Sequence, residues 1–235
     1  VALRNKARIP AHVCFRTKPQ LAVAMLRQAQ QDGIPQGVVL ADSAFGDNVE
    51  FRTQVKDLGL DYAVGIHSPT NVITIGRRGE RSASLSARAL ADSLSPAQFK
   101  KLRWRDGTKK PLQARFAFRR VVIPKDPRQE PLWLVVEWPD DDAKPSHFYL
   151  VTLPARTQKT ALIRLLKERY RTEQVYAELK GELGLDHYEG RRYSGWHHHI
   201  STVLCCFAFL VAERERHFPP CARWTAHPCA QPQSA

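Results

Sequence analysis

The sequence has few of the residues that would tie a chain together covalently or through zinc. Its five cysteines are odd in number and form no CxxC pair; they are Cys14, Cys205, Cys206, Cys221 and Cys229. A disulfide scaffold and a zinc module are therefore not expected, and this cysteine usage suits a reducing cytoplasm. Glycine is also scarce, at 12 of 235 residues, which excludes a collagen-like chain.

Long apolar runs are missing as well. No stretch of about 18 uninterrupted apolar residues occurs, so neither a membrane span nor a membrane partner is expected. The basic segment 1–8 is not followed by an apolar stretch of signal-peptide length. The hydrophobic fraction of 43% over 235 residues nevertheless suits a packed core in one large domain or two small ones.

Acidic residues are the scarcer charge. The chain has 23 Asp and Glu against 36 Lys and Arg, which leaves a formal charge of +13. A charge of this sign and size favours a polyanion such as nucleic acid as partner, although a merely basic soluble enzyme has the same composition. Residues 97–130 hold eleven of the cations and three acids, a net charge of +8.

Trp104 stands inside this basic stretch, between Arg103 and Arg105. Aromatic side chains interleaved with cations suit stacking on unpaired bases beside phosphate contacts. The alternative is that Trp104 anchors a small core while the cations around it are solvated. The residues themselves leave both interpretations open.

Hydrophobic patterning predicts an α/β layer at the start of the chain. A helix from Lys18, capped by Thr17, is followed by an apolar strand at 37–41, a helix at 48–58 and a strand at 60–66. Short apolar runs without alternation are typical of parallel strands buried on both faces.

A β-rich region follows at 68–154, and helices close the chain. Strands are expected at 71–75, 114–122, 131–138 and 147–152, with a short helix near 96–102. One helix is predicted over 158–183 and another over 195–215, where the apolar segment 200–211 indicates a core helix. The tail 218–235 is expected to be frayed.

Two places in this pattern could carry chemistry. Asp42 directly follows the apolar strand, where α/β sheets place functional groups, although a turn or cap role is equally typical of Asp. Arg169, Glu173 and Lys180 fall within about 40° of one another on the predicted helix, as an ordinary solvated face also would. Two carboxylates, Asp42 and Glu173, can share a divalent cation, and hard oxygen ligands suit Mg²⁺ or Mn²⁺.

The segments DSAFGD at 42–47 and RYRTEQVYAELK at 169–180 resemble the DDE-type transposases of bacterial insertion sequences. Within them the chain is similar to the subgroup marked by Tyr-x2-Arg-x3-Glu-x6-Lys. Arg169, Glu173 and Lys180 match that signature, whereas Leu166 stands at its Tyr position. The segments FRTKP at 15–19, GELGLDHYEGR at 181–191 and GWH at 195–197 extend the resemblance over nearly the whole chain.

The resemblance implies a ribonuclease H-like α/β core, interrupted by a β-rich insertion before the final catalytic helix. Asp42 would be the second Asp and Glu173 the Glu of an acidic triad that holds two divalent metals, Mg²⁺ or Mn²⁺. Arg169 and Lys180 would contact DNA phosphate. The insertion would hold a DNA end through a set of aromatic and basic side chains: Trp104, Arg103, Arg105, Lys109 and Lys110.

The implied partners are double-stranded DNA, at transposon ends and target, and a second subunit in a homodimer of the intact protein. No small-molecule substrate is expected, and the expected location is the bacterial cytoplasm at the nucleoid. The first Asp of the triad has no counterpart here, because the 17 residues before the first long helix contain no Asp or Glu.

The chain is therefore expected to be a C-terminal portion that lacks the N-terminal strands and the first Asp. The expected divisions are a partial core at 1–67, the insertion at 68–154, C-terminal helices at 155–217 and the tail at 218–235. Cleavage and strand transfer would be impaired in this portion. The alternatives are an inactive DNA-binding remnant and a ribonuclease H-like nuclease that cuts without joining.

Overall fold

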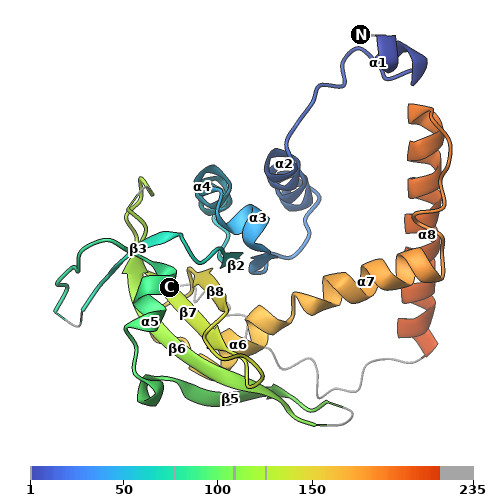
Figure 1. The fold of residues 1–235 in the computed structure, drawn as a ribbon. Helices are drawn as coiled ribbons and strands as arrows, with labels where there is room; N and C mark the ends of the chain where they lie inside the picture. Colours follow the sequence, from blue (N-terminus) through green and yellow to red (C-terminus); the bar gives the residue numbers. More distant parts are fainter. Residues whose placement is uncertain (1, 77, 108–109, 125, 218–235) are drawn as a thin grey trace, which may run out of the picture. The chain divides into compact units, whose positions relative to one another are not determined.

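The computed structural model describes residues 2–76, 78–107, 110–124 and 126–217 (Figure 1). The chain divides into two compact units, one of residues 16–169 and the other of residues 1–15 with 170–235. The predicted tail from residue 218 lies outside the described residues.

Residues 16–169 form an eight-stranded mixed sheet in the order β1-β2-β8-β7-β6-β3-β4, with β5 paired to β6. β1 and β2 are parallel, and β8, β7 and β6 continue the sheet from β2 in antiparallel pairs. The strands are β1 Val39–Ala41, β2 Tyr62–Ile66, β3 Asn71–Thr74, β4 Leu85–Ser86, β5 Lys100–Arg105, β6 Leu112–Val122, β7 Leu132–Trp138 and β8 His147–Val151. The predicted mixed α/β fold is confirmed, and it is consistent with a ribonuclease H-like core.

The described part of this unit contains the α-helices α2 Lys18–Gln31, α3 Ser43–Gly46, α4 Val49–Asp57, α5 Ala87–Asp92 and α6 Lys159–Lys167. The predicted cap of α2 is confirmed. The Thr17 hydroxyl accepts from the Gln20 N–H at 3.4 Å, and the Gln20 side chain accepts from the Thr17 N–H at 3.0 Å. This reciprocal pair satisfies two donors at the start of the helix.

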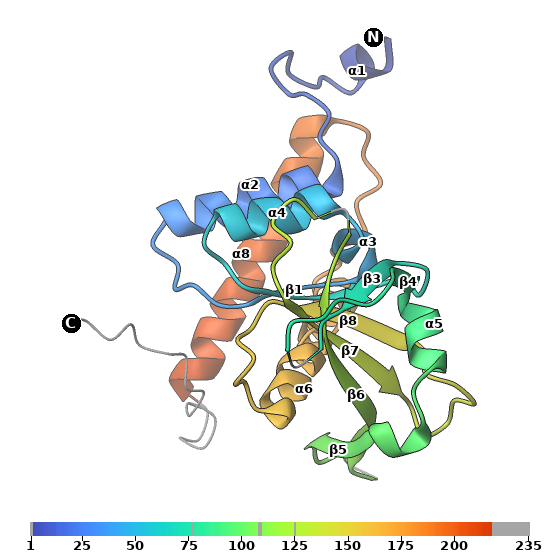
Figure 2. The same ribbon diagram turned by 90° about the vertical axis from the view of Figure 1, so that its left-hand side faces the viewer.

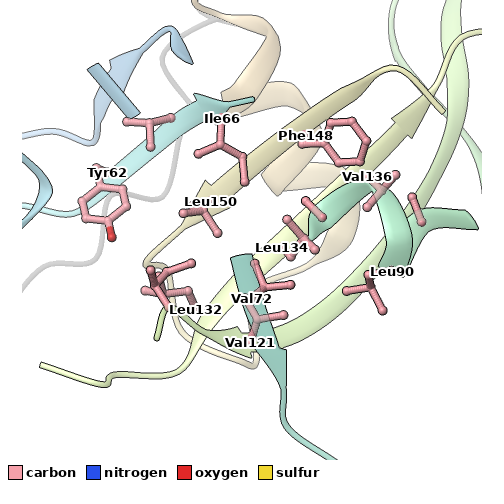
Figure 3. Close-up of a cluster of buried hydrophobic side chains, with 14 of the residues drawn as sticks. Tyr62, Ile66, Val72, Leu90, Val121, Leu132, Leu134, Val136, Phe148 and Leu150 are labelled. Carbon is pink, nitrogen blue, oxygen red and sulfur yellow. The ribbon is translucent and has the colours of Figure 1, made fainter. Parts of the chain in front are cut away.

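The helices cover both faces of the sheet, because side chains alternate across each strand. On one face, α2, α4 and α5 pack on a large cluster that includes Tyr62, Val64 and Leu134 (Figure 3). On the other face, α6 packs on a second cluster that includes Ala63 and Phe116 (Figure 2). The sheet is therefore the middle of three layers.

The short helix predicted near 96–102 is only partly confirmed. The segment 96–102 forms only a single 3₁₀ turn, Pro96–Gln98, and then enters strand β5. In β5 the side chains of Leu102 and Trp104 are partly buried, while Arg103 between them and Arg105 after them are exposed. That alternation has the period of two that a strand needs.

The helix predicted over 158–183 is also interrupted. It consists of α6, which ends at Lys167, and α7, which begins at Tyr170. The Glu168 N–H is shared between the carbonyls of Arg164 and Leu165, a bifurcated pattern typical of a helix end. Arg169 therefore lies between the two helices, and the prediction that it shares one helix face with Glu173 and Lys180 is wrong.

The second unit contains α1 Ala2–Lys6, α7 Tyr170–Gly181 and α8 Tyr193–His217. The Tyr193 N–H at the start of α8 donates to the Ala7 carbonyl at 2.9 Å. The expectation that α8 is a buried core helix is wrong for the described residues, because Val203 is its one buried residue. Four large apolar side chains of α8 are exposed: Trp196, Leu204, Phe209 and Leu210.

By length and composition, α8 is also long and apolar enough to cross a membrane, at a mean hydropathy of 1.2. Polar residues interrupt the helix, among them three consecutive histidines, His197 to His199, so it contains no uninterrupted apolar run of about 18 residues. A single helix of this kind is weak evidence for a membrane span.

Candidate functional site

The carboxyl ends of β1 and β2 lie at one edge of the sheet, because the two strands are parallel. Asp42 directly follows β1, and His67 directly follows β2. Asp42 is exposed, and one of its carboxylate oxygens accepts the Ala44 N–H at 3.0 Å as the N-cap of α3. Asp42 therefore both caps α3 and stands at the end of a strand, as the two interpretations predicted. Its carboxylate has further lone pairs that can bind another ligand.

The short helix α3 is held against β2 by a close backbone approach (Figure 1). A Cβ added to Gly46 would lie 1.8 Å from the Gly65 carbonyl oxygen, and one added to Gly65 would lie 3.2 Å from the Ser43 nitrogen. From α4, the Arg52 guanidinium donates to the Gly46 carbonyl and is only 1% exposed. These contacts fix the turn that carries Asp42.

A hydrogen-bonded set of side chains surrounds the start of this turn. Asp47 accepts from the His67 backbone N–H at 3.1 Å and from the Thr70 hydroxyl at 2.9 Å, and its second oxygen bonds His67 Nδ1. On the other side of the ring, His67 Nε2 lies 3.2 Å from the Ser43 hydroxyl. Sequence reasoning did not single out His67, although it follows a predicted strand as Asp42 does.

The predicted catalytic residue Glu173 and the predicted DNA-binding residue Lys180 belong to a different part of the chain from Asp42. Glu173 and Lys180 are exposed on α7, in the unit of residues 1–15 and 170–235, whereas Asp42 lies in the unit of residues 16–169. Lys180 is seven positions after Glu173, so the two residues share a helix face to within about 20°. Glu173 stands in the first turn of α7 and Lys180 in the last, where each charge suits the helix dipole.

Carboxylates such as Asp42 and Glu173 suit a hard divalent cation by their chemistry. Over the ranges that the structure describes, however, no group of three or more His, Cys, Asp or Glu side chains is placed to hold a metal ion. The donor set therefore fits Mg²⁺ or Mn²⁺ in kind, whereas the described residues of either unit do not assemble a complete ligand cluster.

The basic stretch of the insertion presents its cations and its tryptophan differently. Arg103, Arg105 and Lys110 are exposed, and Arg103 is paired with Asp106; Lys109 lies outside the described residues. Trp104 is partly buried, with its ring centroid 5.9 Å from that of Phe116 and 4.8 Å from the Lys167 ammonium. These contacts favour the packing role of Trp104, and its stacking on DNA stays a prediction.

The sheet, with a carboxylate at the carboxyl end of one of its parallel strands, defines a mixed α/β domain that is consistent with a ribonuclease H-like core. Residues 1–111, just under half of the 235-residue chain, match the family described as DDE superfamily endonuclease. This match supports a DDE-type transposase or endonuclease domain and includes Asp42. None of the curated proteins matches the chain.

Proposed function

We propose that this chain carries part of the catalytic machinery of an insertion-sequence transposase, which cleaves and joins DNA at transposon ends. The observation that carries the proposal is the position of Asp42. It stands at the carboxyl end of β1, beside the parallel strand β2, within the stretch that matches a DDE endonuclease family. Carboxyl ends of strands are where α/β sheets place their functional groups.

In this proposal Asp42 and Glu173 are ligands of Mg²⁺ or Mn²⁺. When bound, such ions activate an attacking oxygen and neutralise charge on the leaving one. Arg169 and Lys180 bind DNA phosphates near the scissile bond, one through a planar guanidinium and the other through an ammonium. The intact transposase works as a homodimer on double-stranded DNA at the bacterial nucleoid.

The exposed cations of the insertion extend the DNA surface. Arg105 and Lys110 are exposed, as is Arg103. A DNA phosphate would take the place of Asp106 as the ion-pair partner of Arg103. Each bound phosphate releases condensed counterions, so the slope of log affinity against log salt should become shallower by about 0.9 for each phosphate that a variant no longer binds. Lys110→Gln and Arg105→Gln should each show this shallower slope in fluorescence anisotropy with duplex DNA. Lys144→Gln, outside the stretch 97–130, is the matched control.

A specific observation favours impaired cleavage by this chain. Residues 1–17, which precede α2, contain no Asp or Glu. Within the described residues, β1 is the end strand of its sheet and pairs with β2 only. We therefore propose that the first acidic ligand is not supplied by the segment before α2, and that the chain binds DNA without cleaving it efficiently.

The test is plasmid nicking and strand joining with Mg²⁺ or Mn²⁺. The proposal expects salt-dependent DNA binding and little nicking. Metal-dependent nicking that is lost in Asp42→Ala would refute the impairment and keep the nuclease assignment. Pre-cut DNA ends then separate a transposase, which joins them to target DNA, from a nuclease that only cuts. Absence of DNA binding at about 50 mM salt would contradict the transposase proposal itself.

A further inference from the structure

We propose that Lys159, Arg120 and Trp133 form a binding site for a phosphate group, where the start of α6 meets β6 and β7. The Lys159 ammonium lies 3.1 Å from the centroid of the Trp133 ring, and the Arg120 guanidinium carbon lies 4.9 Å from it. Two cations therefore meet at one indole ring. Their charge favours a phosphate group with about two negative charges, as inorganic phosphate and phosphate monoesters have near neutral pH.

The sheet register brings these side chains together. Arg120 of β6 is the direct cross-strand partner of Trp133 of β7, so both lie on the same face of the sheet. The Phe118 ring meets the Trp133 ring edge to face, with centroids 6.5 Å apart. Lys159 is the first residue of α6, which packs on this face (Figure 2). The Trp133 indole N–H donates to the Pro154 carbonyl at 3.2 Å, which orients the ring.

The two cations lack an acidic counterpart among the described residues. Burial lowers the pKa of Arg120, and burial together with the charge of Arg120 lowers the pKa of Lys159; no described carboxylate raises either pKa. Arg120 Nη2 donates to the Pro131 carbonyl at 2.6 Å, whereas its Nη1 is buried and has no described hydrogen-bond partner. An anion beside both cations would offset their repulsion and their loss of solvation.

The other end of the same strand pair shows such a cluster with a carboxylate in place. Arg115 of β6 is the cross-strand partner of Trp138 of β7, and its guanidinium carbon lies 3.9 Å from the centroid of that ring. One oxygen of Asp140 lies 4.0 Å from Arg115, and the other lies 3.0 Å from the Lys101 ammonium. A lysine, an arginine and a tryptophan thus share one carboxylate there. At Trp133 the described residues supply the same three side-chain types without the carboxylate, and an external oxyanion can take that position.

The site is accessible and is separate from the residues of the proposed function. Lys159 and Arg120 are both partly exposed. Strands β2 and β8 lie between β7 and β1, the strand that Asp42 follows. Arg120 also stands seven positions after Gln113, the β6 partner of Arg103, which is about 23 Å along the strand. The proposal therefore does not rest on the transposase function.

The test is NMR of the ¹⁵N-labelled whole chain during titration with inorganic phosphate, in EDTA and at an ionic strength held constant with chloride. The indole N–H signal of Trp133, assigned with Trp133→Phe, should shift and saturate, because the anion draws the two cations away from the ring. The indole N–H signal of Trp138 is the internal reference, since Asp140 already pairs with the cations beside it. Dimethyl phosphate, a diester with a single charge, should bind more weakly than inorganic phosphate.

The variants show whether the two cations hold the anion. Lys159→Gln and Arg120→Gln should each weaken phosphate binding about 10-fold or more, because a hydrogen bond to a charged group contributes at least that factor. Lys159→Arg keeps the charge and should retain most of the binding, and Lys144→Gln, at an exposed lysine, is the matched control. An unchanged Trp133 signal in the wild-type chain, or equal phosphate affinity in wild type and Lys159→Gln, would overturn the proposal. Urea unfolding of Lys159→Gln, with the wild-type midpoint expected, separates lost binding from lost folding.

A second titration distinguishes two sources of the phosphate group. A short DNA strand with a 5′-phosphate is compared with the same strand that ends in a 5′-hydroxyl. Tighter binding of the phosphorylated strand, lost in Lys159→Gln, supports the site with a strand end as its ligand. Equal binding of the two strands, with inorganic phosphate still bound at Trp133, supports it with free phosphate as its ligand. Because neither assay contains metal or measures cleavage, failure here is distinct from failure of the proposed transposase function.

Discussion

Gly46 is the position where a single methyl group should disturb the candidate site most. Its ideal Cβ would lie 1.8 Å from the Gly65 carbonyl oxygen, 3.0 Å from the Gly65 carbonyl carbon and 3.0 Å from Val64 Cγ2. Contacts shorter than 3.0 Å essentially never occur for Cβ atoms, so Gly46→Ala requires the two backbones to separate by about 1.2 Å, the difference between 3.0 Å and 1.8 Å.

The obstacle is backbone, and it has little freedom to move. Gly65 lies in β2 and pairs with Tyr149 of β8. The Gly46 carbonyl is bonded by the buried Arg52. Overpacking that forces backbone shifts costs typically about 1–3 kcal/mol, and we expect Gly46→Ala to lower the free energy of unfolding by about 3 kcal/mol.

Urea unfolding followed by circular dichroism measures this change, with the m-value held constant between variants. Gly37→Ala is the matched control, because a Cβ there meets nothing within 4 Å; it should stay within about 0.5 kcal/mol of wild type. A Gly46→Ala variant as stable as Gly37→Ala would refute the close approach of α3 and β2 and, with it, the fixed position of Asp42.

Two further predictions concern buried groups of the unit of residues 16–169. Lys167 bonds both Glu137 oxygens, at 2.5 and 2.7 Å, and Glu137 is 3% exposed. Lys167→Met leaves this buried carboxylate without its cation, so it should lower the free energy of unfolding in urea by about 3 kcal/mol. The double variant Lys167→Met with Glu137→Gln should recover most of that loss. Burial raises the pKa of Tyr62 from 10.0 to about 12, although the positive charge of Arg52 acts to lower this pKa. Because the folded-state pKa is the higher one, this stabilisation is complete below pH 10.0 and is lost as the pH rises towards about 12. Wild type should lose stability over that window faster than Tyr62→Phe, and identical pH profiles would contradict a buried Tyr62.

Short-range patterns predicted much of the unit of residues 16–169. Thr17 and Gln20 form the predicted capped start of α2, because a capping box depends only on residues three apart. The apolar segments 37–41 and 60–66 contain β1 and β2. Strand β5 was not predicted, because Pro96 and the charged residues around Leu102 favour a short helix by local pattern, whereas the pairing with β6 decides the conformation.

The candidate site was predicted only in part, because its contacts join residues far apart in sequence. Asp42 could be found from one strand end. The bond from Asp47 to His67 spans 20 residues, and the bond from Ser43 to His67 spans 24. No periodicity in the sequence reports such a pair, and it forms only once β1 and β2 align in parallel. The break after α6 was likewise hidden, since Glu168 and Arg169 are both good helix formers.

The most direct test of the central claim is Mn²⁺ binding to the whole chain in the presence of duplex DNA, measured by calorimetry. If Asp42 and Glu173 are metal ligands of a DDE-type site, Asp42→Asn and Glu173→Gln should each weaken binding about 10-fold or more, as loss of a charged oxygen ligand does. Glu178→Gln, on the same helix α7, should leave binding unchanged. Equal Mn²⁺ affinity in wild type, Asp42→Asn and Glu173→Gln would contradict the proposed active site.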